Sequence, residues 1–549
     1  MRTHLAIVAT LGFLYAGLAC PAPQLVVVNA RVFTADPAQP WAGAIAIEAG
    51  RFTAVGGDAE IRALADHATR VIDAGGRLVT PGLVEAHVHL GSTLPSPPIP
   101  LPGLPFPGPT AVQALAAVRD ASMQPGDWIS GVVGPLVARD ARNWRVALDE
   151  AAPDRPVVLV GFWGHTTLLN SAALKRLGVA DNVPDPVGGW WGRDAAGRLN
   201  GRAYEAAEDT GWHRLNPADP DRTAAEFQEA GRRYARWGVT SIHLMNSSRS
   251  LAETVGALAR VGTLQKWTVY SWARGEDRIA DGWRAIDVGP KVLPRHVRID
   301  GPKWLLDGTG IEQNARQREP YAGRGTWRGR SNYTDAQLRE ILQTALRRPE
   351  QLALHVVGDA ETDRLFKAME SLAPAKRWTA KRVRVEHGDG LRADTLAQAA
   401  RLGVVVTQNP THLPPPQPEG APRLFDRVSM LRSLVAAGVP LALGSDGGPG
   451  EANPFLNIML ASTYTAAPNE ALTREQALLA YTTGGAFAEG LERVKGRIAP
   501  GMAADLTVLS QDILTVSRQA LPATRSILTI LDGEVVYEDL GITRPTGPK

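Results

Sequence analysis

Residues 80–90 read Thr-Pro-Gly-Leu-Val-Glu-Ala-His-Val-His-Leu, an apolar stretch with two histidines separated by a single valine. If this stretch is a β-strand, its side chains alternate between two faces, so His87 and His89 project to the same side. Burying two imidazole rings side by side is costly unless a partner such as a divalent metal takes up their lone pairs. A pair of hydrogen-bonded structural histidines is the alternative, and the short motif alone leaves both interpretations open.

The spacing of apolar runs along the rest of the chain predicts a large barrel. After residue 238, short strand-like runs recur with gaps long enough for helices, and helical patterns occupy 335–346, 359–372 and 391–401. With the strand around His87 this makes eight strands, which predicts an α/β fold, a (β/α)8 TIM barrel whose chemistry lies at the carboxyl ends of its strands. The other seven predicted strands are Val239–Met245, Lys266–Trp272, Val297–Leu306, Leu352–Val357, Val383–His387, Val404–Gln408 and Leu441–Gly444.

The two ends of the chain share a different pattern, in which short strands alternate with tight turns. Such strands fill residues 25–73 and return only at 505–537, and neither piece has enough strands to bury a core alone. We therefore expect the two termini to form one small β-sandwich, with the barrel between them and an inserted subdomain after the first barrel strand. The predicted bounds are 20–78 and 496–549 for the sandwich, 79–495 for the barrel and about 91–235 for the insertion.

The first residues indicate export. A basic start is followed by an uncharged apolar run, 5–19, that is short for a permanent membrane span, so we expect residues 1–19 to be a signal peptide. The stretch Gly-Leu-Ala-Cys at 17–20 resembles a bacterial lipoprotein cleavage box with Cys20 as the lipid anchor, although Gly17 stands where a larger aliphatic residue is usual. Ordinary signal cleavage gives the same mature start, so a periplasmic protein and a membrane-anchored lipoprotein both remain open.

Composition and charge narrow the range of partners. Hydrophobic residues make up 44% of the chain and charged residues 21%, which is typical of a soluble globular enzyme. The formal net charge of +3 is small for 549 residues, and no dense Lys/Arg run interleaved with aromatic residues occurs, so we expect no nucleic-acid partner. We expect a small-molecule substrate and membrane contact only through Cys20, and a homo-oligomer remains open.

Polar residues that suit a metal fall where the predicted strands end. His355 and His387 each close an apolar run, Asp446 follows another, and Lys303 lies within the fourth predicted strand. The carboxyl ends of barrel strands meet at one mouth, so these side chains should gather there with His87 and His89. Neutral imidazole and carboxylate are ligands for a borderline divalent ion, with zinc as the default and iron, manganese or cobalt as alternatives.

In an ordered set of motifs the chain resembles the metal-dependent amidohydrolase superfamily, specifically the amidohydrolase-3 group. The resemblance covers residues from about 25 to 540, and the motifs are specific for the family but much less so for a substrate. The motifs are Pro81–His89, Gly164–Leu174, Lys303 with Asp307-Gly308, His355–Asp359, Val385–His387, Gly444–Asp446 and Lys495–Leu506.

The resemblance implies a metal centre at the barrel mouth. Its ligands would be His87 and His89 for one ion, His355 and His387 for a second, Asp446 against the first, and Lys303, carboxylated on its amine, as a bridge. Burial beside cations would favour this carboxylation because it lowers the pKa of the lysine amine. An unmodified Lys303 in an ion pair is the alternative, and a single-metal site would follow from it.

The resemblance also implies hydrolysis of a C–N bond in an amide, N-acyl amine or N-formyl amine. A metal-bound water loses a proton near neutral pH, and Asp446 can accept that proton and pass it to the departing amine. The second metal or His165 can polarise the substrate carbonyl group, although His165 could equally orient the substrate or fix the inserted subdomain. The alternatives are a deaminase or cyclic-amidine hydrolase, which normally uses one metal, and an exported metal- or ligand-binding protein without turnover.

Three further features receive predictions. The Arg-rich stretch 316–330 would favour a substrate carboxylate if it faces the pocket, whereas a solvated loop is the alternative. Trp190, Trp191 and Trp327 could form an apolar wall or take part in ordinary packing. Asn170 is expected to cap a helix that begins at the next residue.

Overall fold

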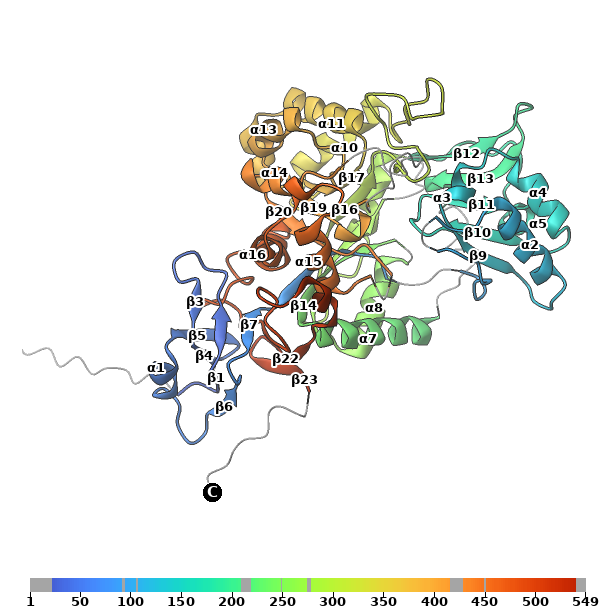
Figure 1. Ribbon diagram of the computed structural model, residues 1–549. Coiled ribbons are helices and arrows are strands. Elements are labelled where there is room, and N and C mark those ends of the chain that lie inside the picture. The colour runs from blue at the N-terminus through green and yellow to red at the C-terminus, as the bar shows by residue number, and fades with distance from the viewer. Residues whose placement is uncertain are drawn as a thin grey trace, which may run out of the picture.

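The computed structural model describes residues 22–90, 94–104, 107–208, 219–247, 249–273, 278–414, 428–448 and 451–539. The predicted signal peptide and Cys20 therefore lie outside the described residues. Figure 1 shows a central barrel with a small unit made mainly of β-strands on one side and a separate α/β unit on the other. Within the described ranges, no helix combines the length and the apolar character that a membrane crossing needs.

The barrel strands form one parallel sheet in which each strand pairs with the next barrel strand along the chain. The prediction of a (β/α)8 barrel is confirmed, and seven of the eight strands begin and end within one residue of their predicted limits. A hydrogen bond from the Asp446 N–H to the His87 carbonyl, 2.9 Å long, joins the ends of the first and last strands. The strands are β8 (Leu83–Val88), β14 (Val239–Asn246), β15 (Lys266–Trp272), β16 (Val297–Leu305), β17 (Ala353–Val356), β18 (Arg384–His387), β19 (Val405–Gln408) and β20 (Leu441–Leu443).

Helices cover the outside of this sheet because their apolar faces pack against the strands. The predicted insertion, 91–235, includes most of α7 (Pro220–Arg236). This helix packs against α8 and β14 and therefore belongs to the barrel, so the insertion ends earlier than predicted. The other principal barrel helices are α8 (Leu251–Val261), α10 (Asp335–Arg347), α11 (Asp359–Leu372), α12 (Ala375–Lys381), α13 (Ala393–Leu402), α14 (Leu431–Ala436), α15 (Pro454–Thr463) and α16 (Arg474–Leu479).

The strands from the two termini lie in two sheets around a shared apolar core, as the sandwich prediction requires. One sheet has the order β5-β4-β1-β6, and the other, β23-β22-β21-β7-β2-β3, joins both ends of the chain through antiparallel pairing of β7 with β21. The predicted boundary at residue 78 cuts through β7. The strands are β1 (Leu25–Val28), β2 (Arg31–Phe33), β3 (Trp41–Ala42), β4 (Ala44–Glu48), β5 (Arg51–Gly56), β6 (Arg70–Asp73), β7 (Leu78–Pro81), β21 (Leu506–Leu509), β22 (Ser526–Leu531) and β23 (Glu534–Glu538).

The insert is a five-stranded sheet, in the order β12-β13-β11-β10-β9, with helices packed on it. Asn170 caps α5 as predicted, since its side-chain oxygen accepts hydrogen bonds from the Ala173 N–H at 2.8 Å and the Val157 N–H at 3.0 Å. The elements are β9 (Ile129–Val133), β10 (Val157–Gly161), β11 (Thr166–Leu169), β12 (Gly189–Arg193), β13 (Leu199–Glu205), α2 (Ala111–Ser122), α3 (Pro135–Arg139), α4 (Trp144–Ala151) and α5 (Ser171–Leu177).

Candidate metal centre

The predicted site residues gather at the carboxyl ends of the barrel strands. The carboxylate of Asp446, just past β20, lies 3.6 Å from His87 Nε2 and 3.4 Å from His89 Nε2. His387 ends β18, and its ring centroid lies 5.1 Å from that of His87. Ligand atoms of His87, His387 and Asp446 all lie within 4.8 Å of one another, which is close enough for one ion to bridge them.

The remaining two predicted ligands, on β16 and β17, complete the cluster. Lys303 is almost fully buried, and its Nζ lies 2.9 Å from His87 Nε2 and 4.8 Å from the ring centroid of Trp272. The His355 ring lies 4.5 Å from the His387 ring, and its Nε2 is 3.4 Å from the carbonyl oxygen of Gly308. All six residues predicted to hold metal therefore occupy one mouth of the barrel.

Outer partners fix three of the imidazole rings. His87 Nδ1 lies 2.6 Å from Glu386 Oε2, His89 Nδ1 lies 3.0 Å from Ser247 Oγ, and His387 Nδ1 lies 2.8 Å from Asn409 Oδ1. When Nδ1–H donates to such an oxygen, the lone pair remains on Nε2, which is the form that binds a metal. The oxygen partners thus orient each ring and select its tautomer.

Burial favours the neutral form of His87, His355 and His387. It lowers the pKa of His87, and it holds the pKa of His355 and of His387 well below the ordinary histidine value, with neighbouring cationic groups adding to the effect. Neutral imidazoles have the lone pairs that a metal needs. Imidazoles with a carboxylate, as in the group of His87, His387 and Asp446, are a donor set that zinc and related divalent ions prefer, so the residues present fit the implied metal.

Glu386 connects the metal cluster to a charged network inside the barrel. Its Oε1 accepts a hydrogen bond from Arg384 Nε at 2.7 Å, and neither side chain is exposed. Burial alone would raise the pKa of Glu386, but the Arg384 charge and the His87 hydrogen bond outweigh burial and hold that pKa far below its usual value. Arg384 also donates to Tyr270 and lies 2.9 Å from His243 Nδ1, so the carboxylate stays ionised behind His87.

Close approach between the first and last strands requires a glycine. A Cβ on Gly444 would lie 2.3 Å from the His87 backbone nitrogen and 2.8 Å from Glu85 Oε1. Such distances are far inside van der Waals contact, so a side chain at 444 would push β8 away from Asp446. The glycine before the Ser-Asp pair therefore sets the distance between two predicted ligands.

His165 lies beside the metal cluster but belongs to the insert. Its ring is 4.7 Å from that of His355, and its Nδ1 is 3.0 and 3.1 Å from the two carboxylate oxygens of Glu205 at the end of β13. Glu312, in the loop after β16, completes a second buried group whose ligand atoms lie within 4.8 Å of one another. Burial raises the pKa of Glu312 to about 7, with His165 opposing this shift and the charge of Glu205 adding to it.

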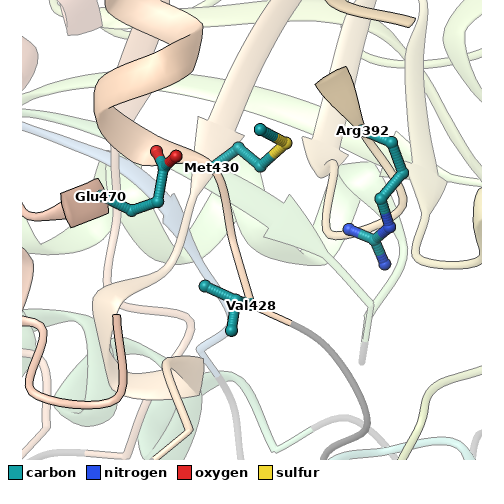
Figure 2. A pocket seen from close by; sticks show the side chains of 4 residues that line it. All are labelled: Arg392, Val428, Met430 and Glu470. Carbon is teal, nitrogen blue, oxygen red and sulfur yellow. The ribbon is translucent and has the colours of Figure 1, made fainter. Parts of the chain in front are cut away.

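Of two cavities in the described residues, one lies away from the predicted site residues and the other lies near them. The larger, about 370 Å³, lies between the start of α13 and the start of α14, and Figure 2 shows its lining side chains, Arg392, Val428, Met430 and Glu470. None of them is a predicted site residue. A much smaller enclosed cavity lies at the seam between insert and barrel, where Glu205 and Trp272 line it together with Tyr333. Trp272, which lines this small cavity, also contacts His89 and Lys303, so the small cavity adjoins the predicted metal cluster.

Two arginines of the Arg-rich stretch, Arg316 and Arg318, are paired with the outer helices and do not form an anion pocket. Arg318 is paired with Asp363 on α11 and with Asp394 on α13, and Arg316 is paired with Glu361. These partners belong to the outer helices. Arginines that are held in such ion pairs are not available to bind a substrate carboxylate.

The aromatic residues named above take part in packing. The Trp190 ring stacks on the Tyr204 ring with centroids 4.9 Å apart. The Arg330 guanidinium carbon also lies 4.1 Å from the Trp190 ring centroid. Trp191 lies in the core of the insert, and the Trp327 Nε1–H donates to the Gln313 carbonyl at 2.7 Å. None of the three lines either of the two cavities.

Sequence reasoning gave no role to several residues that the structure places at the site. Glu386 had a detectable signal, because Arg384 and Glu386 are charged residues two apart in an otherwise apolar strand and so face the same side. Glu205 and Glu312 come from segments far apart in the chain, and no spacing rule joins them. His412, whose Nε2 lies 3.8 Å from Asp446, follows β19 in a loop that no motif marked.

Known proteins resemble the chain over most of its length. It is 26% identical over 545 residues to an N-substituted formamide deformylase from Arthrobacter pascens, which covers 94% of this chain and 99% of that protein. It is 25% identical to the putative amidohydrolase YtcJ of Bacillus subtilis, covering 86% and 91% of the two chains. The Arabidopsis thaliana protein LONG AFTER FAR-RED 3 is 28% identical, with 89% and 87% covered.

Solved structures share the fold. An uncharacterised metal-dependent hydrolase from Pyrococcus horikoshii superimposes with a TM-score of 0.66 at 20% identity, covering 90% of this chain and 99% of the other. A mutant of the atrazine chlorohydrolase TrzN from Arthrobacter aurescens, solved with zinc, gives 0.53 at 16% identity, covering 96% and 97%. The family model described as "Amidohydrolase family" matches residues 70–537, and the chain therefore belongs to the amidohydrolase family.

Proposed function

We propose that this protein is a metal-dependent hydrolase that cleaves the C–N bond of a small amide, N-acyl amine or N-formyl amine. The observation that carries the proposal is the gathering of neutral imidazoles, Lys303 and the Asp446 carboxylate at one barrel mouth. The N-substituted formamide deformylase, which aligns with 94% of this chain, supports a substrate of the N-formyl class. The same proposal assigns the cluster one or two divalent ions, with zinc as the first candidate.

A bound divalent ion supplies a water of lowered pKa and polarises a carbonyl oxygen. His87 and His89 would hold one ion, and His387 with His355 a second; His87, His89 and His387 would bind through Nε2, because each Nδ1 already contacts an outer oxygen. Lys303, if carboxylated, would link the two positions. An unmodified Lys303 would leave a single-metal site.

Asp446 is the candidate general base. Its carboxylate lies beside the imidazoles of His87 and His89 and is partly exposed, so it can take a proton from the attacking water and deliver it to the departing amine. In the tautomer with its proton on Nε2, His165 would donate a hydrogen bond to the substrate carbonyl oxygen as negative charge develops there. Its position beside His355 supports this role.

Metal analysis of the purified protein, followed by assays on N-formyl and N-acyl amines, tests the proposal. Asp446→Asn should lower kcat by about 10²–10⁴ with metal still bound, because it removes a general base. Asp389→Asn is the matched control, since Asp389 is a carboxylate on the same barrel face that contacts Gln408 and Ser429 instead of metal ligands. Equal rates for Asp446→Asn and wild type would refute catalysis at this centre, and ammonia as the product would favour a deaminase.

We also propose that the protein is exported, with Cys20 as a lipid anchor if the lipoprotein box is used. The N-terminal sequence alone supports this. Fractionation of cells that express the full chain or its Cys20→Ala variant separates the outcomes: a lipoprotein leaves the membrane fraction on substitution, whereas a periplasmic protein does not change.

A further inference from the structure

A second group of metal-binding side chains lies outside the predicted centre, at the seam between the insert and the barrel. It consists of His165, Glu205 and Glu312, which are between 3% and 5% exposed. His165, just before β11, and Glu205, at the end of β13, lie side by side because these two strands pair antiparallel with Thr166 opposite Tyr204, whereas Glu312 follows barrel strand β16. Three separate segments thus bring an imidazole and two carboxylates to one buried point.

The backbone around this point leaves room for the ligands and for little else. A Cβ on Gly308 would lie 2.6 Å from Glu312 Oε1 and 3.0 Å from Glu205 Oε1, so the two carboxylates lie against the same glycine. Thr309 holds Glu312 in place through its N–H and its hydroxyl group. The His165 Nδ1 faces Glu205 at 3.0 Å. The side chains are therefore oriented toward one another by contacts other than a shared ion.

We infer that His165, Glu205 and Glu312 form a separate binding site for a divalent cation that clamps the insert to the barrel. Two carboxylates and an imidazole within 4.8 Å form a donor set for ions such as Mn²⁺ or Zn²⁺, and buried carboxylates that lie close together are stabilised when a cation neutralises them. None of the three residues is among the predicted ligands of the barrel-mouth centre. The small cavity lined by Glu205 and Trp272 adjoins the site and would admit water to complete the coordination.

Such an ion has a consequence for His165, and this consequence, unlike the site itself, rests on the proposed function. A cation held at Nδ1 takes the place of the proton between the ring and Glu205. The remaining ring proton must then lie on Nε2, which is the tautomer that can donate to a substrate carbonyl oxygen. The seam ion would thus fix His165 in its hydrogen-bond-donating form.

Ion counting tests the site directly. Metal-free protein is loaded with Mn²⁺, desalted and analysed for metal per chain, in wild type, Glu312→Gln and Glu319→Gln. Glu319 is the matched control because it is an exposed carboxylate in the same loop. Glu312→Gln should hold one ion fewer per chain than wild type, and Glu319→Gln should equal wild type. Glu205→Gln should lose the same ion and replaces Glu312→Gln if that variant fails to fold.

The comparison is repeated in a His87→Ala, His387→Ala background, which removes ligands of the barrel-mouth centre. If the seam site exists, the protein with Glu312 still binds one ion more per chain than the protein with Glu312→Gln in this background, whether or not the protein has the proposed activity. If Glu312→Gln and Glu205→Gln both fold and bind as many ions as the protein without these substitutions, in either background, the inference is overturned. His165, Glu205 and Glu312 would then be held together by hydrogen bonds alone. Activity that fails while the one-ion difference remains would refute the proposed function alone.

Discussion

Replacing Glu386 by glutamine tests whether the network behind His87 tunes the metal centre. The substitution keeps the shape of the side chain and removes its charge. In the native protein one oxygen of Glu386 contacts His87 Nδ1 at 2.6 Å and the other accepts from Arg384 at 2.7 Å, with both partners fully buried. A single substitution therefore perturbs a metal ligand and a buried ion pair together.

The magnitudes follow from these two contacts. Loss of an outer partner of a metal-binding histidine typically costs 10–100-fold in metal affinity, which is about 1.4–2.8 kcal/mol. Breaking a buried ion pair costs about 3–5 kcal/mol because one charge stays buried without its partner. Arg384 keeps its hydrogen bonds to the Ala86 carbonyl and to Thr407, so we expect the lower end of that range.

Metal affinity is measured by competition with a chromophoric chelator, and the free energy of unfolding of the metal-free protein is measured in urea. Glu492→Gln is the control, because Glu492 forms a comparable two-bond pair with Arg382 at 2.7 and 2.8 Å but is partly exposed. It should cost less than about 1 kcal/mol and leave metal affinity unchanged. The double variant Arg384→Gln, Glu386→Gln should recover part of the lost stability. If Glu386→Gln binds metal as tightly as Glu492→Gln, the network does not tune the centre.

Three further outcomes are expected. Burial alone would raise the pKa of Asp532, but hydrogen bonds from His296 and Lys266 outweigh burial and lower that pKa. The ionised Asp532 therefore stabilises the fold above about pH 4, and this contribution is lost in more acidic solution. Asp532→Asn should lower the free energy of unfolding in urea by about 1 kcal/mol at pH 7 and weaken its decrease at acid pH. Gly444→Ala should abolish metal binding in a metal assay, because its Cβ would collide with the His87 backbone. Asn170→Ala should cost about 2–4 kcal/mol in thermal unfolding, since three buried hydrogen bonds and one partly buried one are lost. A loss under about 1 kcal/mol would contradict this account.

The barrel could be predicted because its strands carry a local signal. Runs such as Lys266–Trp272 are apolar, short and bounded by turn residues, and the structure has that strand with the same limits. Most of the metal residues could be predicted for a related reason, since they are polar residues at the ends of apolar runs; Lys303, inside its strand, is assigned through the resemblance to the family. Parallel strands in a barrel bring such ends together whatever their separation in the chain. Local patterns and one topological rule were therefore enough.

The unpredicted parts depend on contacts between distant segments. Helix α7 has a clear amphipathic pattern, but that pattern does not say whether its apolar face covers the insert or β14. In the same way, the arginines after Asp307 could face the pocket or the outer helices, and only the position of Asp363 and Asp394 decides the matter. Periodicity determines that a face is buried, whereas its partner is determined by the packing of the whole fold.

The barrel and the insert contribute different residues to the candidate site. Every predicted metal ligand is on a barrel strand or immediately after one, so the barrel alone could hold the ions. His165 and Glu205, by contrast, come from the insert and reach the same mouth, where they meet Glu312 of the barrel. A change in the angle of the insert would thus move the groups that face the substrate without moving the metal ligands. Because the seam holds two carboxylates close together, whatever neutralises them also sets that angle, and substrate choice in this protein should be sensitive to the seam even when the metal centre is unchanged.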